Sequence, residues 1–164
     1  MDKIEGFVYI LGDDINTDAI VPSHALTMRD SNEMAKYTLE FIDPDFVKKT
    51  KSLDIIVAGE NFGTGSSREE AVKVFKNLGI KAVIAKSFAR IYFRNLINSG
   101  MPAIKLKWQD ANFKNGDAIK IDLNSGNIIN QTQKLSLKFP KLPKFIMEVL
   151  EEGGIIKRLK KKFD

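Results

Sequence analysis

The sequence predicts an α/β fold that is organised around a mixed β-sheet. In the middle of the chain, short apolar runs alternate with helical segments, which is typical of parallel strands joined by helical crossovers. Beyond residue 115 the pattern changes to short strand-like runs separated by turn residues, which is typical of antiparallel hairpins. The chain has 164 residues, of which 43% are hydrophobic and 29% charged. These ordinary globular values allow a buried core in a single domain over residues 1–164.

The N-terminal segment opens with a predicted strand over residues 6–11, where the sequence reads GFVYIL. A polar loop over residues 13–22 follows and ends in a short apolar stretch. A short helix is expected over residues 34–41. It should end before the Asp43-Pro44 pair, because a residue that precedes proline disfavours helical backbone.

The central part of the chain reads strand, helix, strand, helix, strand. Its first strand is the continuous apolar run LDIIVA, as expected where both faces of a parallel sheet are covered. The first helix is stopped by Gly79, and Ser87 is expected to cap a second helix that ends near Gly100. The strands are expected over residues 53–58, 81–85 and 101–106, and the first helix over residues 67–78.

The C-terminal part predicts an extra β layer and a helical end. A helix is expected over residues 143–151, and two glycines separate it from a basic helical tail over residues 155–164. The antiparallel strands before that helix are expected over residues 116–122, 127–130 and 135–139.

The composition restricts the chemistry that the chain can perform alone. It contains no cysteine and one histidine, His24. Thiolate metal sites, cysteine nucleophiles, chain-held iron–sulfur clusters and multi-histidine metal sites are therefore excluded, and a Ser-His-Asp triad is disfavoured. For catalysis or binding, the chain must use hydroxyls, carboxylates, arginines and backbone amides, or rely on the catalytic groups of a partner.

The net charge of +5 is a property of the C-terminal tail. Residues 157–164 carry five basic side chains and one acid, whereas the rest of the chain has 21 basic and 20 acidic residues. A solvated helix end with lysines at its C-terminal dipole explains this pattern better than a nucleic-acid surface, because aromatic side chains are not interleaved with the cations. No apolar run approaches membrane-spanning length, and we expect a cytoplasmic protein without a membrane partner.

A glycine-rich turn over residues 59–65 is the most informative segment. It joins a predicted buried strand to a helix, the place where open α/β sheets bind ligands. The residues that follow, Ser66-Ser67-Arg68-Glu69-Glu70, complete neither a dinucleotide fingerprint nor a P-loop nor a nucleophile elbow.

Two interpretations of this segment stay open together. Free amides and a helix dipole would favour an anion, Arg68 suits a carboxylate, and Ser66 or Ser67 could act as base or nucleophile. The spacing of the serines and glutamates also fits a capping box, in which one serine caps the helix while the other faces a ligand.

For two other segments, a structural role explains the sequence better than a functional one. The loop over residues 14–18 fits half of a calcium-binding loop but lacks its glycine and its closing glutamate, so an Asx-rich turn is expected instead. Arg90 and Arg94 share a helix face, and at least one is expected to pair with Glu69, Glu70 or another surface acid.

Several motifs in the same order resemble the swivelling domain of the aconitase superfamily over nearly the whole chain. Within that superfamily, the short length and the closing Lys141-Leu142-Pro143 and Gly153-Gly154 resemble the family of separate small subunits of 3-isopropylmalate dehydratase. The remaining matching residues are Asn16-Thr17-Asp18, Ile20-Val21-Pro22, Gly59, Asn61-Phe62-Gly63, Gly65 to Glu69, Ala82 to Ala85, Ser87 to Ile91, Asn95, Asn98 and Gly100.

The resemblance implies a three-layer β/β/α swivelling domain and a hydro-lyase that moves a hydroxyl between neighbouring carbons through an unsaturated intermediate. It implies a large-subunit partner that carries a 4Fe–4S cluster, with no cofactor bound by this chain. Ser66 would be the alkoxide base, while Ser67 and Arg68 would bind the substrate carboxylate and stabilise the alkoxide. Asp18 would support them from behind.

The resemblance also implies that the loop over residues 23–30, which includes His24, contacts the variable part of a small hydroxy-dicarboxylic acid. Neutral or apolar Thr27 and Met28 suit an isopropyl branch, and Arg29 keeps a tricarboxylate alternative open. The alternative substrates within the superfamily are homoaconitate, 2-methylmalate, citraconate and dimethylmalate. Relatives usually have histidine where this chain has Glu70. A stand-alone anion- or RNA-binding module is the alternative from another class.

Overall fold

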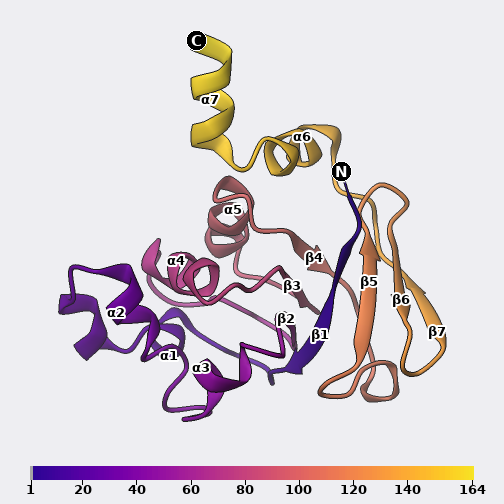
Figure 1. Cartoon of the computed structure of the whole chain (residues 1–164), viewed down its shortest axis with the longest axis horizontal. Coiled ribbons are helices and arrows are strands. Elements are labelled where there is room, and N and C mark those ends of the chain that lie inside the picture. The colour runs from indigo at the N-terminus through magenta and orange to yellow at the C-terminus, as the bar shows by residue number, and fades with distance from the viewer. Residues whose placement is uncertain (1) are drawn as a thin grey trace.

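A computed structural model describes residues 2–164, and its strands form one seven-stranded sheet (Figure 1). The strand order is β4-β3-β2-β1-β5-β6-β7. The first four strands in that order are parallel and the remaining pairs are antiparallel, which confirms the predicted mixed sheet. The strands are β1 (Ile4–Ile10), β2 (Ile55–Ala58), β3 (Ala82–Ala85), β4 (Ala103–Lys105), β5 (Ala118–Asp122), β6 (Asn127–Asn130) and β7 (Leu135–Lys138).

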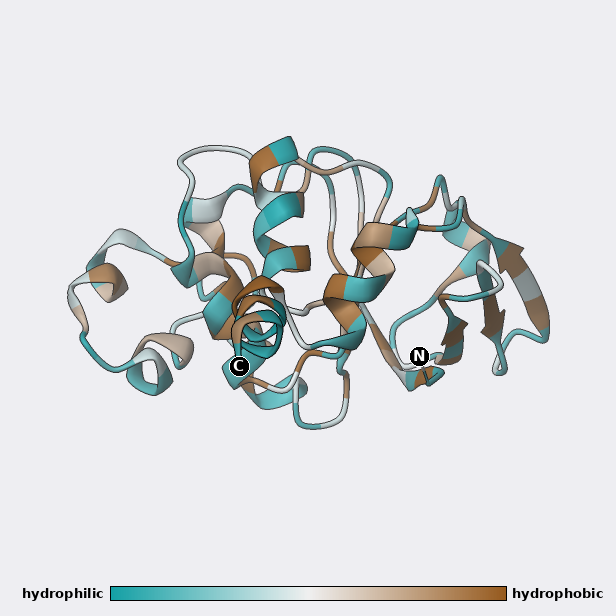
Figure 2. Ribbon diagram, turned by 90° about the horizontal axis from the view of Figure 1, so that it is seen from above, coloured by the Kyte–Doolittle hydropathy of each residue, from teal (hydrophilic) through white to brown (hydrophobic). Residues whose placement is uncertain are grey.

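The longest strand, β1, belongs to both halves of the sheet. Its C-terminal residues 8–10 pair with β2 in parallel, while residues 4–7 pair with β5 in the antiparallel sense. At the changeover, the amide of Phe7 donates to Asp54 Oδ1 at 2.8 Å and that of Val8 donates to the carbonyl of Asp117 at 2.9 Å. The antiparallel strands form an extra β layer beside the parallel half, on the right of Figure 1 and, seen from above, on the right of Figure 2.

The helices lie beside the parallel half of the sheet or at the chain's C-terminal end (Figure 1). Two of them, α4 and α5, are the crossovers between parallel strands. Four short elements lie between β1 and β2, and two helices follow β7. The helices are α1 (Thr17–Ile20), η1 (Ser23–Thr27), α2 (Ser31–Ala35), α3 (Phe46–Lys49), α4 (Glu70–Asn77), α5 (Arg90–Asn98), η2 (Asp110–Asn112), α6 (Lys144–Glu151) and α7 (Ile155–Phe163).

The core forms where α4 packs on the central strands. Every residue of β2 and β3 is buried, as predicted for strands covered on both faces. Phe62, fully buried, stacks on Phe75 of α4 with ring centroids 6.4 Å apart. It also meets Phe88 and Tyr92 edge-on, so the glycine-rich loop is anchored in the aromatic core.

Three expectations about helix ends and caps are wrong. The first crossover helix begins at Glu70, not at residue 67, and no serine caps it. The carbonyl of Ser66, which a longer helix would use for its own ladder, accepts from the Thr17 hydroxyl at 2.9 Å. Ser87 does not cap α5, because its hydroxyl donates to Glu60 and accepts from the amide of Asn61.

The helix expected over residues 34–41 is shorter and lies earlier, at α2. The carboxylate of Asp30 caps it by accepting from the amide of Asn32 at 2.9 Å. Leu39 adopts a positive φ of 56°, which ends helical geometry, and its amide donates to the carbonyl of Ile20. The single turns α1, η1 and α3 were not predicted, because such short elements leave no periodic pattern.

The C-terminal predictions are confirmed. The three antiparallel strands and both last helices lie where expected, and α7 is the basic helical tail. Within residues 2–164, no helix has the length and apolar character needed to cross a membrane.

Replacing Phe62 with alanine should lower the free energy of unfolding by about 3–5 kcal/mol, because it leaves a cavity among three aromatic rings. The matched control is Phe41→Ala, at a ring that is 75% exposed, which should cost about 0.5 kcal/mol or less. Urea denaturation of both variants measures the difference. Equal losses would contradict the packing described here.

Candidate functional site

Two loops are joined at the carboxyl ends of β1 and β2. The amide of Thr17 donates to the carbonyl of Thr64 at 2.8 Å, and the amide of Gly63 donates to the carbonyl of Ile15 at 2.7 Å. The Thr17 hydroxyl then holds the carbonyl of Ser66. These bonds fix the backbone on both sides of the glycine-rich turn, so the serines leave it in a defined direction.

Carboxylates brace the same two loops. Asp13 Oδ1 accepts from the amide of Glu60 at 2.7 Å, and Asp14 Oδ1 accepts from the side-chain amide of Asn61 at 2.9 Å. Asp14 and Asn61 both have positive φ, a strained conformation that this mutual contact supports. Of the Asx residues in this loop, Asn16 makes the predicted local bond by accepting from the amide of Ala19, whereas Asp13 and Asp14 bind the other loop. Among residues 2–164, no cluster of acids and histidine fits a metal ion.

The Glu60 carboxylate extends the brace to the ends of β3 and β4. It accepts from the hydroxyl of Ser87 at 2.7 Å and pairs with the ammonium group of Lys107 at 3.0 Å. Ser87 and, next, Lys107 hold the pKa of the Glu60 carboxyl below its usual range. The loop is thus tied to each neighbouring strand end.

Gly63 is required at its position. It has φ of 86°, and an added Cβ would lie 2.2 Å from Cγ of Tyr92. Burial raises the pKa of the Tyr92 phenol well above its ordinary value, and its hydroxyl donates to the carbonyl of Ala71. The loop therefore rests directly on a fixed ring of α5.

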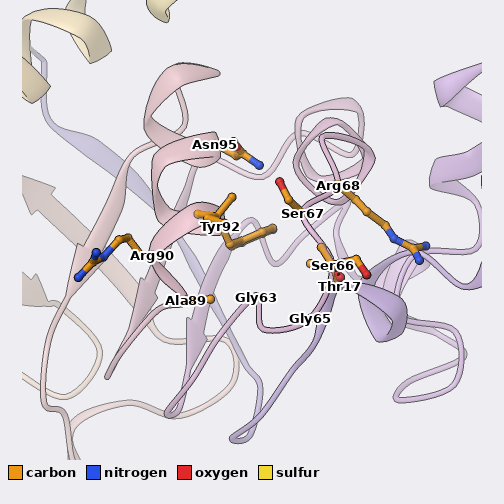
Figure 3. A pocket seen from close by; sticks show the side chains of 11 residues that line it. Thr17, Gly63, Gly65, Ser66, Ser67, Arg68, Ala89, Arg90, Tyr92 and Asn95 are labelled. Carbon is orange, nitrogen blue, oxygen red and sulfur yellow. Dashed lines mark hydrogen bonds between the residues drawn. The ribbon is translucent and has the colours of Figure 1, made fainter.

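A cavity of about 280 Å³ opens between this loop and the first two turns of α5 (Figure 3). Thr17, Ser66, Ser67 and Arg68 line it from the loops, and Arg90, Ile91, Tyr92 and Asn95 line it from α5 and its start. In Figure 3, the Ser67 side chain extends toward Asn95, whereas Ser66 lies beside Thr17. Ile91 is 55% exposed, so the rim of the cavity carries an uncovered apolar side chain.

Within residues 2–164, the two serine hydroxyls have no structural task. Both residues are exposed, and within residues 2–164 neither hydroxyl forms a hydrogen bond or caps a helix. The capping-box interpretation is therefore wrong, and both oxygens are available to a ligand.

Arg68 crosses to the neighbouring helix α1. Its Nη2 lies 3.1 Å from Oδ1 of Asp18. Its Nη1 is buried and has no hydrogen-bond partner within residues 2–164. Buried donors are seldom left unpaired, so this nitrogen has unused capacity for an anionic oxygen. In Figure 3 the guanidinium points away from Asn95, toward the far side of the serines.

The expectation that Arg90 or Arg94 pairs with an acid is wrong. Within residues 2–164 neither guanidinium forms an ion pair, and Glu69 and Glu70 lie on a different helix from both. Arg90 lines the cavity at its base, with its guanidinium turned outward in Figure 3.

The sequence interpretation also missed the contributions of Thr17, Arg90 and Asn95 to this cavity. All three lie in segments that the resemblance singled out, but no local pattern distinguished them as site residues. Their signal is topological: parallel strand order brings the three segments to one edge.

The loop over residues 23–30 is not part of the cavity. His24, Thr27, Met28 and Arg29 do not line it, and only Asp18 of the expected outer residues reaches its wall, through Arg68. Nε2 of His24 contacts the Glu40 carboxylate, the His24 ring meets Tyr37 edge-on, and Thr27 donates to the carbonyl of His24. The loop therefore lies outside the cavity and contacts residues 37 and 40.

Comparisons with known proteins agree over most of the chain. A family model described as the aconitase C-terminal domain matches residues 13–109. An isopropylmalate/citramalate isomerase small subunit of Methanocaldococcus jannaschii is 47% identical over 159 residues, which cover 97% of this chain and 95% of that one. A 3-isopropylmalate dehydratase small subunit of Thermotoga maritima is 46% identical, with 96% and 95% covered. The crystal structure of a 3-isopropylmalate dehydratase from M. jannaschii has a TM-score of 0.91 at 44% identity, covering 98% of this chain and 95% of that one.

Gly63→Ala should destabilise the chain more than Gly79→Ala. Both glycines have φ near 80°, but a Cβ at Gly79 would meet nothing within 4 Å. The two variants share the backbone strain, so the clash with Tyr92 should appear as an extra loss of about 1–3 kcal/mol. Urea unfolding midpoints give the comparison, and equal midpoints would refute the close packing.

Proposed function

The chain belongs to the aconitase C-terminal domain family, within its 3-isopropylmalate dehydratase small subunits, and we propose that it supplies half of the active site of such a hydro-lyase. The observation that carries the proposal is the pair of unengaged serine hydroxyls beside Arg68, on a loop that is fixed at both ends. A hydro-lyase of this class must take a proton from carbon, and a held oxygen base meets that need.

Ser66 is the base in this proposal. Its oxygen takes the carbon-bound proton while the hydroxyl leaves the neighbouring carbon, and it returns the proton when water adds back. Arg68 lowers the cost of the serine alkoxide by its charge, and its unpaired Nη1 supports a role in binding a substrate carboxylate. Ser67 donates to that carboxylate, and Asp18 holds the guanidinium in place.

The remaining chemistry belongs to a second chain. Without cysteine, this chain cannot hold an iron–sulfur cluster by thiolates. We propose a large subunit that carries a 4Fe–4S cluster, whose open iron acts as a Lewis acid on the substrate hydroxyl when bound. In this proposal the large subunit covers the cavity rim, where Ile91 is exposed.

The substrate in this proposal is isopropylmalate. Of the loop residues proposed to contact its branch, Thr27 is exposed and neutral, and Met28 is half-buried and apolar. Citramalate, which is 2-methylmalate, is the second candidate, because the relative from M. jannaschii is named for both acids. In this chain alone, the loop lies outside the cavity. In the proposed complex, the large subunit closes over the cavity and brings the loop and the substrate together.

Mutating Ser66 to alanine should abolish turnover without loss of fold. The assay mixes the chain with its candidate large subunit, bearing a reconstituted cluster, under anaerobic conditions. It follows the ultraviolet absorbance of the unsaturated acid formed from 3-isopropylmalate. We expect turnover only in the mixture, and a loss of at least about 100-fold in kcat for the variant.

The control is Ser136→Ala, at an exposed serine of β7 far along the sheet, which should leave kcat unchanged. Full activity of Ser66→Ala would rule out this serine as the base. Turnover with citramalate but not isopropylmalate would keep the chemistry and change the substrate. No turnover with either acid, or with homoaconitate and dimethylmalate, despite an intact cluster would overturn the hydro-lyase proposal.

Thr27→Arg should shift the preference toward homoaconitate. A guanidinium at this position can meet an additional carboxylate and disfavours an alkyl branch. We expect the ratio of kcat/KM for isopropylmalate over homoaconitate to fall by at least about 10-fold. An unchanged ratio would show that this loop does not select the substrate.

A further inference from the structure

A groove of about 560 Å³ lies between α4, α5 and α7, next to the cavity described above. Its lining includes four lysines, Lys73 and Lys76 from α4 and Lys157 and Lys160 from α7, with Glu69 as the acid among them. The basic tail is therefore one wall of a concave surface, and α4 supplies the facing wall. This arrangement joins cations that are more than 80 residues apart in the sequence.

Ion pairs do not engage these lysines in the part of the chain that the structure describes. The ammonium group of Lys76 donates to the carbonyl of Ser99 at 2.6 Å. Among residues 2–164, no carboxylate forms an ion pair with any of the four lysines. The groove thus holds a positive charge that the rest of the described chain leaves uncompensated.

The wall formed by α7 has a fixed orientation. Gly154 is buried against the turn that ends α5, where an added Cβ would lie 2.6 Å from the carbonyl oxygen of Asn98. Arg158 pairs with Glu148 and Glu152 at 3.2 Å each, which ties α7 to α6. In Figure 1, α7 accordingly stands out from the body of the molecule above α5.

An apolar stripe runs beside the lysines on the same helix. Ile156, which lines the groove, is 61% exposed, and Leu159 and Phe163 are 44% and 79% exposed. Positions 156, 159 and 163 share one helix face at spacings of three and four. A small anion would engage the lysines and leave this stripe in water, so the surface fits a polypeptide better.

The groove is continuous with the candidate active site. Asn95 lines both the cavity that contains Ser66 and the groove, and Glu69 follows directly after Arg68. A partner that closes the cavity therefore reaches the edge of the groove. This continuity favours one partner for both surfaces.

We propose that this groove is a docking surface for an acidic segment of the large subunit that also carries apolar side chains. The inference rests on the proposed function, since it assigns the partner of that function a contact on this chain. Carboxylates of the segment meet the four lysines, and its apolar side chains cover Ile156, Leu159 and Phe163. A second copy of this chain fits less well, because facing lysine walls repel each other.

The test reverses two charges in the groove. Lys157→Glu/Lys160→Glu should weaken the complex with the cluster-bearing large subunit by at least about 10-fold in Kd at 50 mM salt. The difference from the unaltered chain should shrink at about 500 mM salt, because charge interactions are screened. The kcat at saturating large subunit should stay unchanged, since neither lysine lies in the cavity.

The matched control, Lys114→Glu/Lys138→Glu, makes the same change in net charge at exposed lysines on the antiparallel side of the sheet. It should alter Kd by less than about 3-fold. Equal effects of the two double variants would reduce the result to net charge and overturn the proposal. A Leu159→Ser/Phe163→Ser variant tests the apolar stripe and should also raise Kd, with little dependence on salt.

Other occupants give distinct results. If the groove variants change only self-association of the isolated chain in sedimentation, or only its binding to anionic lipid vesicles, the proposed docking surface is wrong. An active, tight complex that is indifferent to both groove variants would overturn this inference and leave the proposed function standing. If the unaltered chains form no active complex, the proposed function fails, and this inference fails with it.

Discussion

The backbone hydrogen bonds between the loop after β1 and the loop after β2 hold the rest of the candidate site in position. Adjacent parallel strands end at the same edge of a sheet, so their loops meet without a long connection. The amides of Thr17 and Gly63 donate across this junction, and the hydrogen bond between Asn61 and Asp14 joins two residues with positive φ. The hydrogen bonds across the junction offset that strain, and they hold in place a serine-bearing segment that forms no helix of its own. Because the two strands are neighbours in the sheet, their loops can bond to each other, and these bonds hold the backbone of the two serines in place.

The shared strand β1 connects this edge to both halves of the sheet. One side of β1 extends the parallel half that carries the loops, and the other side joins the antiparallel half. The two central strands of the parallel half are buried throughout, whereas β5 and β6 alternate buried and less buried residues. The site therefore lies on the more deeply buried half of the sheet. The extra β layer supports that half from the side and contributes no residue to the cavity.

Much of this architecture could be predicted from the sequence, because apolar runs and turn residues report local structure directly. The strands over 55–58 and 82–85 have nearly the predicted bounds, as do the hairpin strands. The start of α4 could not be predicted, because a hydroxyl 49 positions away takes the carbonyl of Ser66. Ser66, Ser67 and Arg68 emerged from their motif, whereas Thr17, Arg90 and Asn95 needed the three-dimensional neighbourhood. The pairing of Arg68 with Asp18 is likewise a tertiary contact that spacing does not encode.

The loop over residues 23–30 lies outside the cavity, and this position bears on how such subunits can diversify. Ala25 is buried and holds the loop to the body, but Thr27 and Arg29 face water and Met28 is half-buried. Exchanges at such exposed positions usually change stability by no more than about 0.5 kcal/mol. If the loop contacts the substrate as proposed, mutations at these positions are selected for their effect on activity and hardly at all for their effect on folding. Under that proposal, a lineage could change its substrate acid at these positions while the scaffold and the serine-bearing loop stayed as they were.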